Sequence, residues 1–423
     1  MAKASKSITL ETAMEVIASV MANEKLVVLS CGGGNGSHVT ATITAARPNT
    51  ESRVLTLFAD EAERWTKAMG NDNMEVNIAY SDGTSREVKG KPALITKDPA
   101  KAVKGADIIF IVLPAFAHTD YFKAIAPHVS PNTVIVGLPG QAGFNINCIY
   151  EMGDTSKKCA IANFETLPFN CRIVEFGRKA QIIGFKGYCA GSVIMGQSKP
   201  KMAPMDMIQS ILGPDCRYDD MGNFVAIYLL AKSICHPPLM YGRWSKWDGQ
   251  PLDEAPLFYQ GVDQWQADLL EGIGDECVAI AKDIEKKRPG TKMDAVIPML
   301  DWMKRSYCEL IADSSTLYHA NRTNKGYDGL RHPMIRTKEG KFLPDFSTRY
   351  LSEDIPYGLV VMKGIGELSG TKTPVIDEVI TWCQKKLGKE YLIGSELKGK
   401  DLVETRAPQK YGYMTLEQLF SIM

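Results

Sequence analysis

Proton transfer near neutral pH is a reaction that the histidines of this chain could perform, because an imidazole changes its charge between about pH 5 and 8. The 423 residues contain six histidines: His38, His118, His128, His236, His319 and His332. His236 follows the apolar run 225–234 and precedes two prolines, which stop a helix and fix the direction of the chain. We therefore take His236 as the candidate acid–base residue, with a buried structural histidine as the competing interpretation.

A second group of ionisable side chains lies between Asp345 and Leu359, inside an otherwise apolar C-terminal stretch. Arg349 offers a planar guanidinium for a substrate carboxylate, and Asp354 could orient a histidine and stabilise its charged form. Together with a histidine they would form a proton-transfer pair beside a carboxylate anchor. A cluster of surface salt bridges would have the same composition.

A glycine-rich run from Gly32 to Ser37 separates the strand-like stretch 25–30 from the helix-compatible stretch 37–46. On the pattern G-x-G-x-x-G/A, Gly32 and Gly34 match and Ser37 takes the third position. A helix that begins behind such a loop offers amide donors to a pyrophosphate, whereas a chance glycine-rich turn does not. This context predicts that a dinucleotide is bound by Gly32, Gly33, Gly34, Asn35, Gly36 and Ser37.

A carboxylate that binds the ribose usually follows the first glycine by about 20 residues. Asp60 is the candidate, 28 residues after Gly32. It suits equally the N-cap of a helix that starts near Glu61. No Lys or Arg lies between Phe58 and Glu63 to bind a 2′-phosphate, which favours NAD over NADP.

Two more loops follow apolar runs, residues 106–113 and 133–138, that are typical of strands buried on both faces of a parallel sheet. Ligands of such sheets bind at the carboxyl ends of the strands. Pro114 and His118 in the first loop are therefore candidate cofactor contacts, and Gln141 in the second is a candidate to line the same crevice.

The scaffold that would position these residues is an α/β fold. Alternating strands and helices over the first 200 residues predict a Rossmann-type doubly wound parallel sheet, and long helical periodicities predict an all-helical C-terminal domain. We expect a helical extension at 1–23, a nucleotide-binding domain at 24–203 and a helical substrate domain at 204–423. The irregular segment 323–356 is long enough to be functional or mobile.

Charge and composition exclude several classes of partner. The chain has 49 Lys+Arg against 49 Asp+Glu and a formal net charge of +0, so we expect no nucleic-acid or membrane partner. No apolar run approaches the roughly 20 residues of a membrane span, and the N-terminus lacks a signal peptide's apolar core. We therefore expect a cytoplasmic protein. The 10 cysteines form no C-x-x-C pair, so we expect neither a metal site nor a disulfide framework.

Taken in order along the chain, the motifs resemble the opine dehydrogenase family, the octopine-dehydrogenase type of marine invertebrates, from about Lys25 onward. The segments that carry the resemblance are Cys31-Gly-Gly-Gly-Asn-Gly-Ser-His38, Leu57-Phe-Ala-Asp-Glu-Ala-Glu-Arg-Trp65, Pro114-Ala-Phe-Ala-His118, Gly137-Leu-Pro-Gly-Gln-Ala-Gly-Phe144, Glu165-Thr-Leu-Pro168 with Cys171-Arg172, His236-Pro237, and Arg349-Tyr-Leu-Ser-Glu-Asp-Ile-Pro-Tyr-Gly358.

Members of that family use NADH to condense an α-keto acid, usually pyruvate, with the amino group of an amino acid or taurine, and the family's habit suggests a monomer. The resemblance implies His236 as acid–base residue, Asp354 as its partner and Arg349 as carboxylate anchor. It also implies that Gln141 and Cys171 lie near the substrate crevice.

The sequence departs from the family's pattern at three places. The first 23 residues extend beyond the usual N-terminus, Ser37 replaces a commoner alanine, and the run 231–235 differs from an Asn-Pro-containing run close to the amino-acid pocket. Taurine, glycine, alanine, β-alanine and arginine all stay open as the amine. A hydroxyacid dehydrogenase that uses no amine, and a non-catalytic NAD-binding protein, are the alternative functions.

Overall fold

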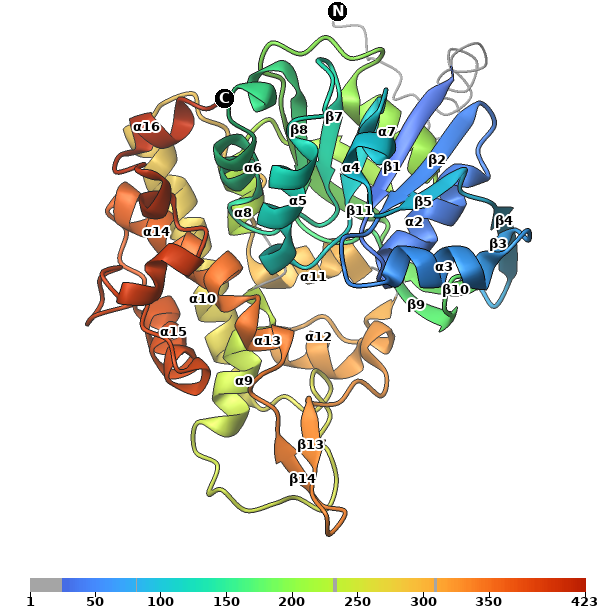
Figure 1. The fold of residues 1–423 in the computed structure, drawn as a ribbon. Helices are drawn as coiled ribbons and strands as arrows, with labels where there is room; N and C mark the ends of the chain where they lie inside the picture. The colour runs from blue at the N-terminus through green and yellow to red at the C-terminus, as the bar shows by residue number, and fades with distance from the viewer. Residues whose placement is uncertain (1–24, 81, 231–233, 308–309) are drawn as a thin grey trace, which may run out of the picture.

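The computed structural model describes residues 25–80, 82–230, 234–307 and 310–423 (Figure 1). An α/β unit with a large sheet occupies the upper right of Figure 1, and a helical unit lies along its left side and beneath it. The helical extension expected at 1–23 lies outside the described residues.

The main sheet has the order β12-β11-β8-β7-β6-β1-β2-β5, in which every pairing is parallel except that of β11 with β8. Central strands such as β6 are buried at every residue, as expected of strands covered on both faces. The strands are β1 (Leu26–Cys31), β2 (Thr50–Leu55), β5 (Leu94–Thr96), β6 (Ile108–Ile111), β7 (Val134–Gly137), β8 (Ala160–Phe164), β11 (Tyr188–Ile194) and β12 (Arg217–Asp220).

Helices on the faces of this sheet complete the doubly wound α/β arrangement that the sequence predicts. They are α2 (Asn35–Ala45), α3 (Glu61–Met69), α4 (Pro99–Val103), η1 (Ala115–Ala117), α5 (His118–Ile125), α6 (Phe144–Met152), η2 (Gly153–Lys158) and α7 (Pro204–Leu212). Residues of α7 share an apolar core with β1, β6 and β7, and β12 pairs with β11. The α/β unit thus continues past the expected boundary at 203, and we propose that the division follows Asp220.

A smaller sheet of order β4-β3-β10-β9 covers the other side of α2. Its strands are β3 (Met74–Ala79), β4 (Ser85–Gly90), β9 (Phe169–Glu175) and β10 (Lys179–Phe185). Val39 and Ile43 of α2 pack there against Val76 and Ile182. This sheet joins segments about 100 residues apart, so no local pattern in the sequence indicated it.

The second unit is built around the long helix α10, which begins with a capping box between Asp263 and Gln266. Its elements are α8 (Phe224–Leu229), α9 (His236–Trp244), α10 (Gln264–Lys287), α11 (Met299–Tyr307), α12 (Leu317–Thr323), η5 (Lys325–Tyr327), β13 (Met334–Arg336), β14 (Phe342–Pro344), α13 (Arg349–Ser352), η6 (Ile355–Leu359), α14 (Val360–Ser369), α15 (Pro374–Leu387), η7 (Lys400–Glu404), η8 (Pro408–Tyr411) and α16 (Leu416–Phe420). The hairpin of β13 and β14 lies inside the segment 323–356 that sequence patterns left irregular.

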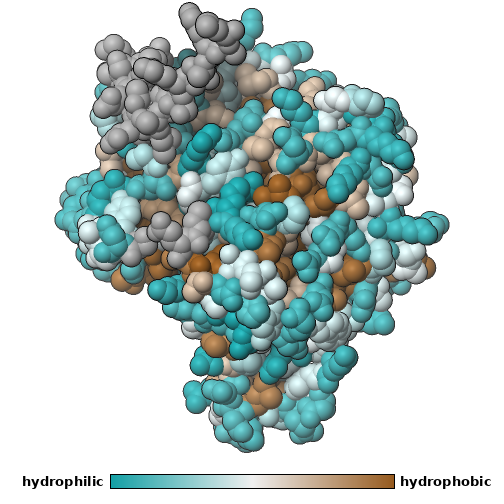
Figure 2. Space-filling model, turned by 180° about the vertical axis from the view of Figure 1, so that it is seen from behind, coloured by the Kyte–Doolittle hydropathy of each residue, from teal (hydrophilic) through white to brown (hydrophobic). Residues whose placement is uncertain are grey.

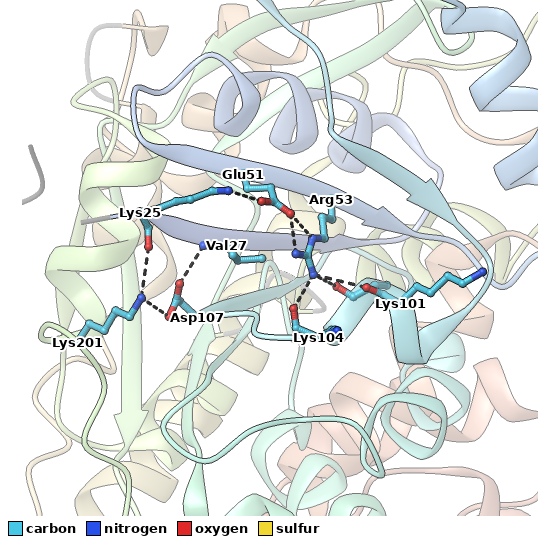
Figure 3. A network of polar contacts seen from close by, with 9 residues as sticks. Lys25, Val27, Glu51, Arg53, Lys101, Lys104, Asp107 and Lys201 are labelled. Carbon is cyan, nitrogen blue, oxygen red and sulfur yellow. Dashed lines mark hydrogen bonds and ion pairs between the residues drawn. The ribbon is translucent and has the colours of Figure 1, made fainter. Parts of the chain in front are cut away.

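A polar network ties the amino ends of the central strands together (Figure 3). Lys25 pairs with Glu51, which also accepts from Arg53, and Arg53 donates to carbonyls at the end of α4. Asp107 accepts from the backbone N–H of Val27 at 2.9 Å and pairs with Lys201 at 3.0 Å. These contacts close one edge of the sheet and leave the carboxyl edge to the loops described below.

The face seen from behind in Figure 2 is mainly hydrophilic, with apolar side chains gathered in separate patches across the middle of the molecule. Among the described residues, no helix is both long enough and apolar enough to cross a membrane.

Candidate active site

The glycine loop lies where the strand order reverses, because β1 has β2 on one side and β6 on the other. Dinucleotides bind at this point in open α/β sheets. Gly32 has a φ of 118°, and a Cβ there would lie 2.7 Å from the Leu113 side chain and 2.8 Å from the Val112 carbonyl oxygen. A Cβ on Gly34 would meet nothing within 4 Å. Gly32 is therefore required by the fold, while Gly34 leaves room beside the start of α2.

The helix behind the loop is held by its own polar side chains. The Ser37 hydroxyl donates to the Val112 carbonyl at 3.1 Å, so serine fits the small third position of the motif. The Asn35 side chain accepts from the backbone N–H of Ile173 in β9 at 2.8 Å and ties the loop to the smaller sheet.

His38 shapes the same loop as a neutral imidazole. Its Nε2 accepts from the Gly177 N–H at 3.0 Å, so its Nδ1 carries the proton and donates to the Gly34 carbonyl at 3.1 Å. The ring stacks on Trp65 with centroids 3.8 Å apart. Burial lowers the pKa of His38 to about 4.

Glu61, rather than Asp60, is the carboxylate beside the glycine loop. Asp60 directs its exposed side chain to Arg64 at 2.9 Å and makes no side-chain cap for α3. The Glu61 carboxylate accepts from the Thr56 hydroxyl and lies 1.8 Å from where a Cβ on Gly33 would be. Residue spacing thus pointed to Asp60, whereas the side chain that the fold directs toward the glycine loop is that of the next residue, Glu61.

Pro114 lies in the loop after β6, and His118 begins the helix α5 that follows this loop. Only Pro114 is partly accessible to solvent. Pro114 is half-buried and precedes η1. His118 is 0% exposed, donates from Nε2 to the Leu113 carbonyl at 3.0 Å and packs against Phe122 and Phe144. Burial holds its pKa well below the ordinary value. The structure therefore places the side chain of His118 in the core beneath the loop, although the sequence suggested it as a cofactor contact.

Gln141 has the features of a ligand-binding residue. Its φ is 65°, in the left-handed region that disfavours side chains, and it is 2% exposed. Both atoms of its side-chain amide are buried without a hydrogen-bond partner among the described residues. Leaving a buried polar group unpaired costs about 1–3 kcal/mol, so a polar ligand would relieve this position.

His236 and Asp354 meet although 118 residues separate them in the sequence. His236 begins α9 and is followed by Pro237 and Pro238. Prolines are tolerated there because N–H groups in the first turn of a helix make no hydrogen bond within the helix, so their absence costs little. Asp354, 3% exposed, lies 2.5 Å from Nδ1 of His236. The carboxylate therefore holds the proton on Nδ1, and Nε2 of the neutral ring accepts from the Tyr259 hydroxyl at 2.8 Å.

Aromatic rings enclose this pair. Tyr350 stacks on the imidazole with centroids 3.9 Å apart and an interplanar angle of 6°. Tyr259 stacks on Tyr327, and burial raises the pKa of Tyr259 well above its ordinary value. The hydroxyl therefore stays protonated beside Nε2. Sequence reasoning missed both tyrosines; the position of Tyr350 next to Arg349 was the one available signal.

Arg349 starts the short helix α13, five residues before Asp354. Its side chain is 65% exposed and lies 3.8 Å from Glu353. The guanidinium is thus accessible to a solute anion, while its backbone lies five residues before the buried Asp354.

Cys171 is not brought into this group. It lies on β9 at 3% exposure within the apolar core of the smaller sheet, and burial raises the pKa of its thiol to about 12. Among the described residues no polar contact joins it to His236 or Asp354.

Known proteins resemble this chain over most of its length. A family model described as "NAD/NADP octopine/nopaline dehydrogenase, alpha-helical domain" matches residues 221–387. An opine dehydrogenase of Haliotis discus hannai is 49% identical over 403 residues, which are 95% of this chain and 100% of that protein. The chain belongs to the opine dehydrogenase family. It is therefore an oxidoreductase of an NAD- or NADP-linked family, as the motifs predicted.

Other opine dehydrogenases are similar over the same length. A tauropine dehydrogenase of Arabella iricolor is 47% identical over 397 residues, covering 93% of this chain and 100% of that one. An octopine dehydrogenase solved with NADH and pyruvate superposes with a TM-score of 0.85 at 44% identity, over 94% of this chain and 98% of the other. The run 231–235, where the sequence departs from the family pattern, includes residues 231–233, which lie outside the described part of the chain.

Proposed function

We propose that this opine dehydrogenase reversibly condenses pyruvate with the amino group of an amino acid or taurine, using NADH. The observation that carries the proposal is the contact between His236 and the buried Asp354, which follows Arg349 by five residues. A single cleft would then hold an acid–base group and an anchor for a keto acid carboxylate. The octopine dehydrogenase solved with NADH and pyruvate supports the choice of both compounds.

The glycine loop fits a dinucleotide. Gly34 leaves open space at the N-terminus of α2, whose first amides are available to a pyrophosphate. Glu61 lies beside Gly33, where a carboxylate accepts from ribose hydroxyls and repels a 2′-phosphate, so we propose NADH over NADPH. When bound, NADH supplies the hydride that reduces the imine carbon.

His236 is proposed to exchange the proton at Nε2. Asp354 holds the other nitrogen protonated and stabilises the imidazolium, so the charged ring can donate to the keto oxygen as water leaves. In the structure the Tyr259 hydroxyl lies 2.8 Å from Nε2, and the substrate oxygen would bind Nε2 beside that hydroxyl. The proton returns to His236 when the reaction runs toward the keto acid.

Arg349 and Gln141 are proposed to orient the keto acid. The exposed guanidinium of Arg349 matches a carboxylate by two parallel hydrogen bonds. The amide of Gln141 has unused donors and an unused acceptor within the described residues, which suits a second oxygen of the same substrate. Cys171 stays a proposed neighbour of the crevice through the family resemblance alone. We also propose a cytoplasmic monomer; the described cysteines are free thiols, as is typical of a reducing compartment.

The direct test follows NADH oxidation by pyruvate with and without taurine, glycine, alanine, β-alanine or arginine. We expect oxidation to depend on one or more of these amines. In His236→Ala, turnover should fall about 10²- to 10⁴-fold with NADH affinity nearly unchanged, because a positioned acid–base group contributes that factor. His319→Ala removes an exposed histidine of α12 and serves as the matched control.

Equal rates with and without every amine would instead identify a simple keto acid reductase. Unchanged turnover in His236→Ala would remove this residue from the mechanism. Tight NADH binding with no turnover for any amine would favour a binding protein.

A further inference from the structure

The backbone N–H and C=O of one residue in the loop after β6, Ala115, are bonded to two buried charged residues of the helical unit. The N–H of Ala115 donates to Oε1 of Glu353 at 2.9 Å, and its carbonyl accepts from Nη2 of Arg406 at 2.7 Å. Arg406 donates its Nη1 to the Gly140 carbonyl at 3.0 Å. Arg406 therefore joins the loops after β6 and β7, and Glu353 holds the first of them.

Both side chains are almost fully buried, and the proton transfer described above uses neither. Glu353 is 4% exposed and Arg406 is 1% exposed. A buried charge is costly unless hydrogen bonds and an opposite charge compensate it. Here the carboxylate accepts from the Ala115 N–H and the guanidinium donates to the Ala115 carbonyl, so both charges are bonded to the backbone of one residue.

The bonds connect the α/β unit to the helical unit. Ala115 follows β6 at the point where the strand order reverses, and Gly140 precedes Gln141. On the other side, Glu353 precedes Asp354 and lies 3.8 Å from Arg349. A shift of the Ala115 loop would therefore move the cofactor side relative to the acid–base pair.

We infer that Glu353 and Arg406 are positioning residues that hold the Ala115 and Gly140 loops in register with Asp354 and Arg349. The inference rests on the proposed function, because alignment matters only when both sides of the cleft act on one substrate. Misplacing reacting groups by about 1 Å can cost about 100-fold in rate, so these three buried bonds can affect turnover strongly.

Variants of Glu353 separate alignment from bulk stability. Glu353→Gln keeps an acceptor oxygen for the Ala115 N–H, whereas Glu353→Ala removes it. Glu353→Asp shortens the side chain by one methylene and so moves the carboxylate away from the Ala115 N–H. This variant is tested in place of Glu353→Ala if the alanine variant does not fold. Glu276→Ala is the matched control, since Glu276 is also buried and accepts two backbone N–H groups, at 2.7 and 2.9 Å, wholly inside the helical unit.

The first measurement needs neither substrate nor cofactor. Amide hydrogen exchange of the full-length protein should show Ala115 exchanging at least about tenfold faster in Glu353→Ala, because its N–H loses its acceptor. Exchange in Glu353→Gln and Glu276→Ala should stay near that of the parent protein. Unchanged exchange at Ala115 in Glu353→Ala would overturn the inference, whatever reaction the enzyme performs.

The second measurement is kinetic. In Glu353→Ala we expect kcat to fall about 10- to 100-fold, the NADH dissociation constant to stay within about threefold, and the isotope effect with 4-deuterated NADH to rise as the chemical step slows. Glu353→Gln should recover most of kcat. An equal loss in Glu276→Ala, or an unchanged kcat and isotope effect in Glu353→Ala, would reduce Glu353 to a stabilising role. Amine-independent oxidation by the parent protein would refute the proposed function without touching the exchange result.

Discussion

Replacing Asp354 by Asn removes the negative charge beside His236 and keeps the size of the side chain. The amide oxygen can still accept from Nδ1–H, so the ring should keep its orientation. The bond that changes is short, 2.5 Å, and the carboxylate is 3% exposed. A hydrogen bond to a charged group contributes about 1.5–3 kcal/mol, which corresponds to about 10- to 160-fold in rate at 1.36 kcal/mol per factor of ten.

We therefore expect kcat for amine-dependent NADH oxidation to fall by about that factor in Asp354→Asn. NADH affinity, measured by fluorescence titration, should not change, because the glycine loop belongs to the other unit. Asp345→Asn is the control, since among the described residues the Asp345 carboxylate accepts only from the nearby Ser347. Its kcat should match that of the parent protein.

A kcat within twofold of the parent value in Asp354→Asn would refute the role of the charge. A loss of kcat accompanied by an equal loss of NADH affinity, or by a large fall in melting temperature, would mean that the substitution disturbs the fold instead.

Four further predictions follow from the site. Tyr259→Phe removes a donor to the imidazole, and kcat should fall about fivefold for about 1 kcal/mol of lost hydrogen bonding; an unaltered pH–rate profile and kcat would show that the hydroxyl is irrelevant. Arg349→Met should raise the pyruvate KM at least about tenfold; a rise in the amine KM alone would reassign the guanidinium. Glu61→Ala should raise the ratio of kcat/KM for NADPH to that for NADH, and an unchanged ratio would exclude it from cofactor selection. Burial lowers the pKa of His38 to about 4 and of His332 to about 3, so below pH 6.5 the unfolded chain binds more protons than the folded protein. The free energy of unfolding should therefore be lower at pH 5 than at pH 7.5, by about 2 kcal/mol for each imidazole. Urea unfolding at the two pH values measures this difference, and higher stability at pH 5 would contradict the prediction.

Local signals in the sequence predicted much of the α/β unit. The strand Leu26–Cys31, the glycine loop and the helix that follows were found close to their expected bounds, because apolar runs and glycines act within a few residues. The second strand runs over Thr50–Leu55. Parallel pairing with β1 sets its start, and Phe58 falls in an exposed loop.

Features that depend on distant contacts could not be predicted in this way. Strand β4 is largely exposed and carries no apolar alternation, so the smaller sheet had no local signal. The choice between Asp60 and Glu61 depends on which side chain turns toward Gly33, and spacing does not encode that direction.

The candidate site combined both kinds of information. His236, Asp354 and Arg349 were identified by residue type and family resemblance, and the structure brings the first two into contact. Tyr259 and Arg406 follow no motif, because their roles arise from packing between segments far apart in the chain.

The most direct test of the account uses 4-deuterated NADH, pyruvate and a ¹⁵N-labelled amine from the panel that supports turnover. Mass spectrometry of the product should find a secondary amine that carries ¹⁵N together with one deuterium on the carbon derived from the keto group. Deuterated lactate formed at the same rate with or without the amine would contradict the account.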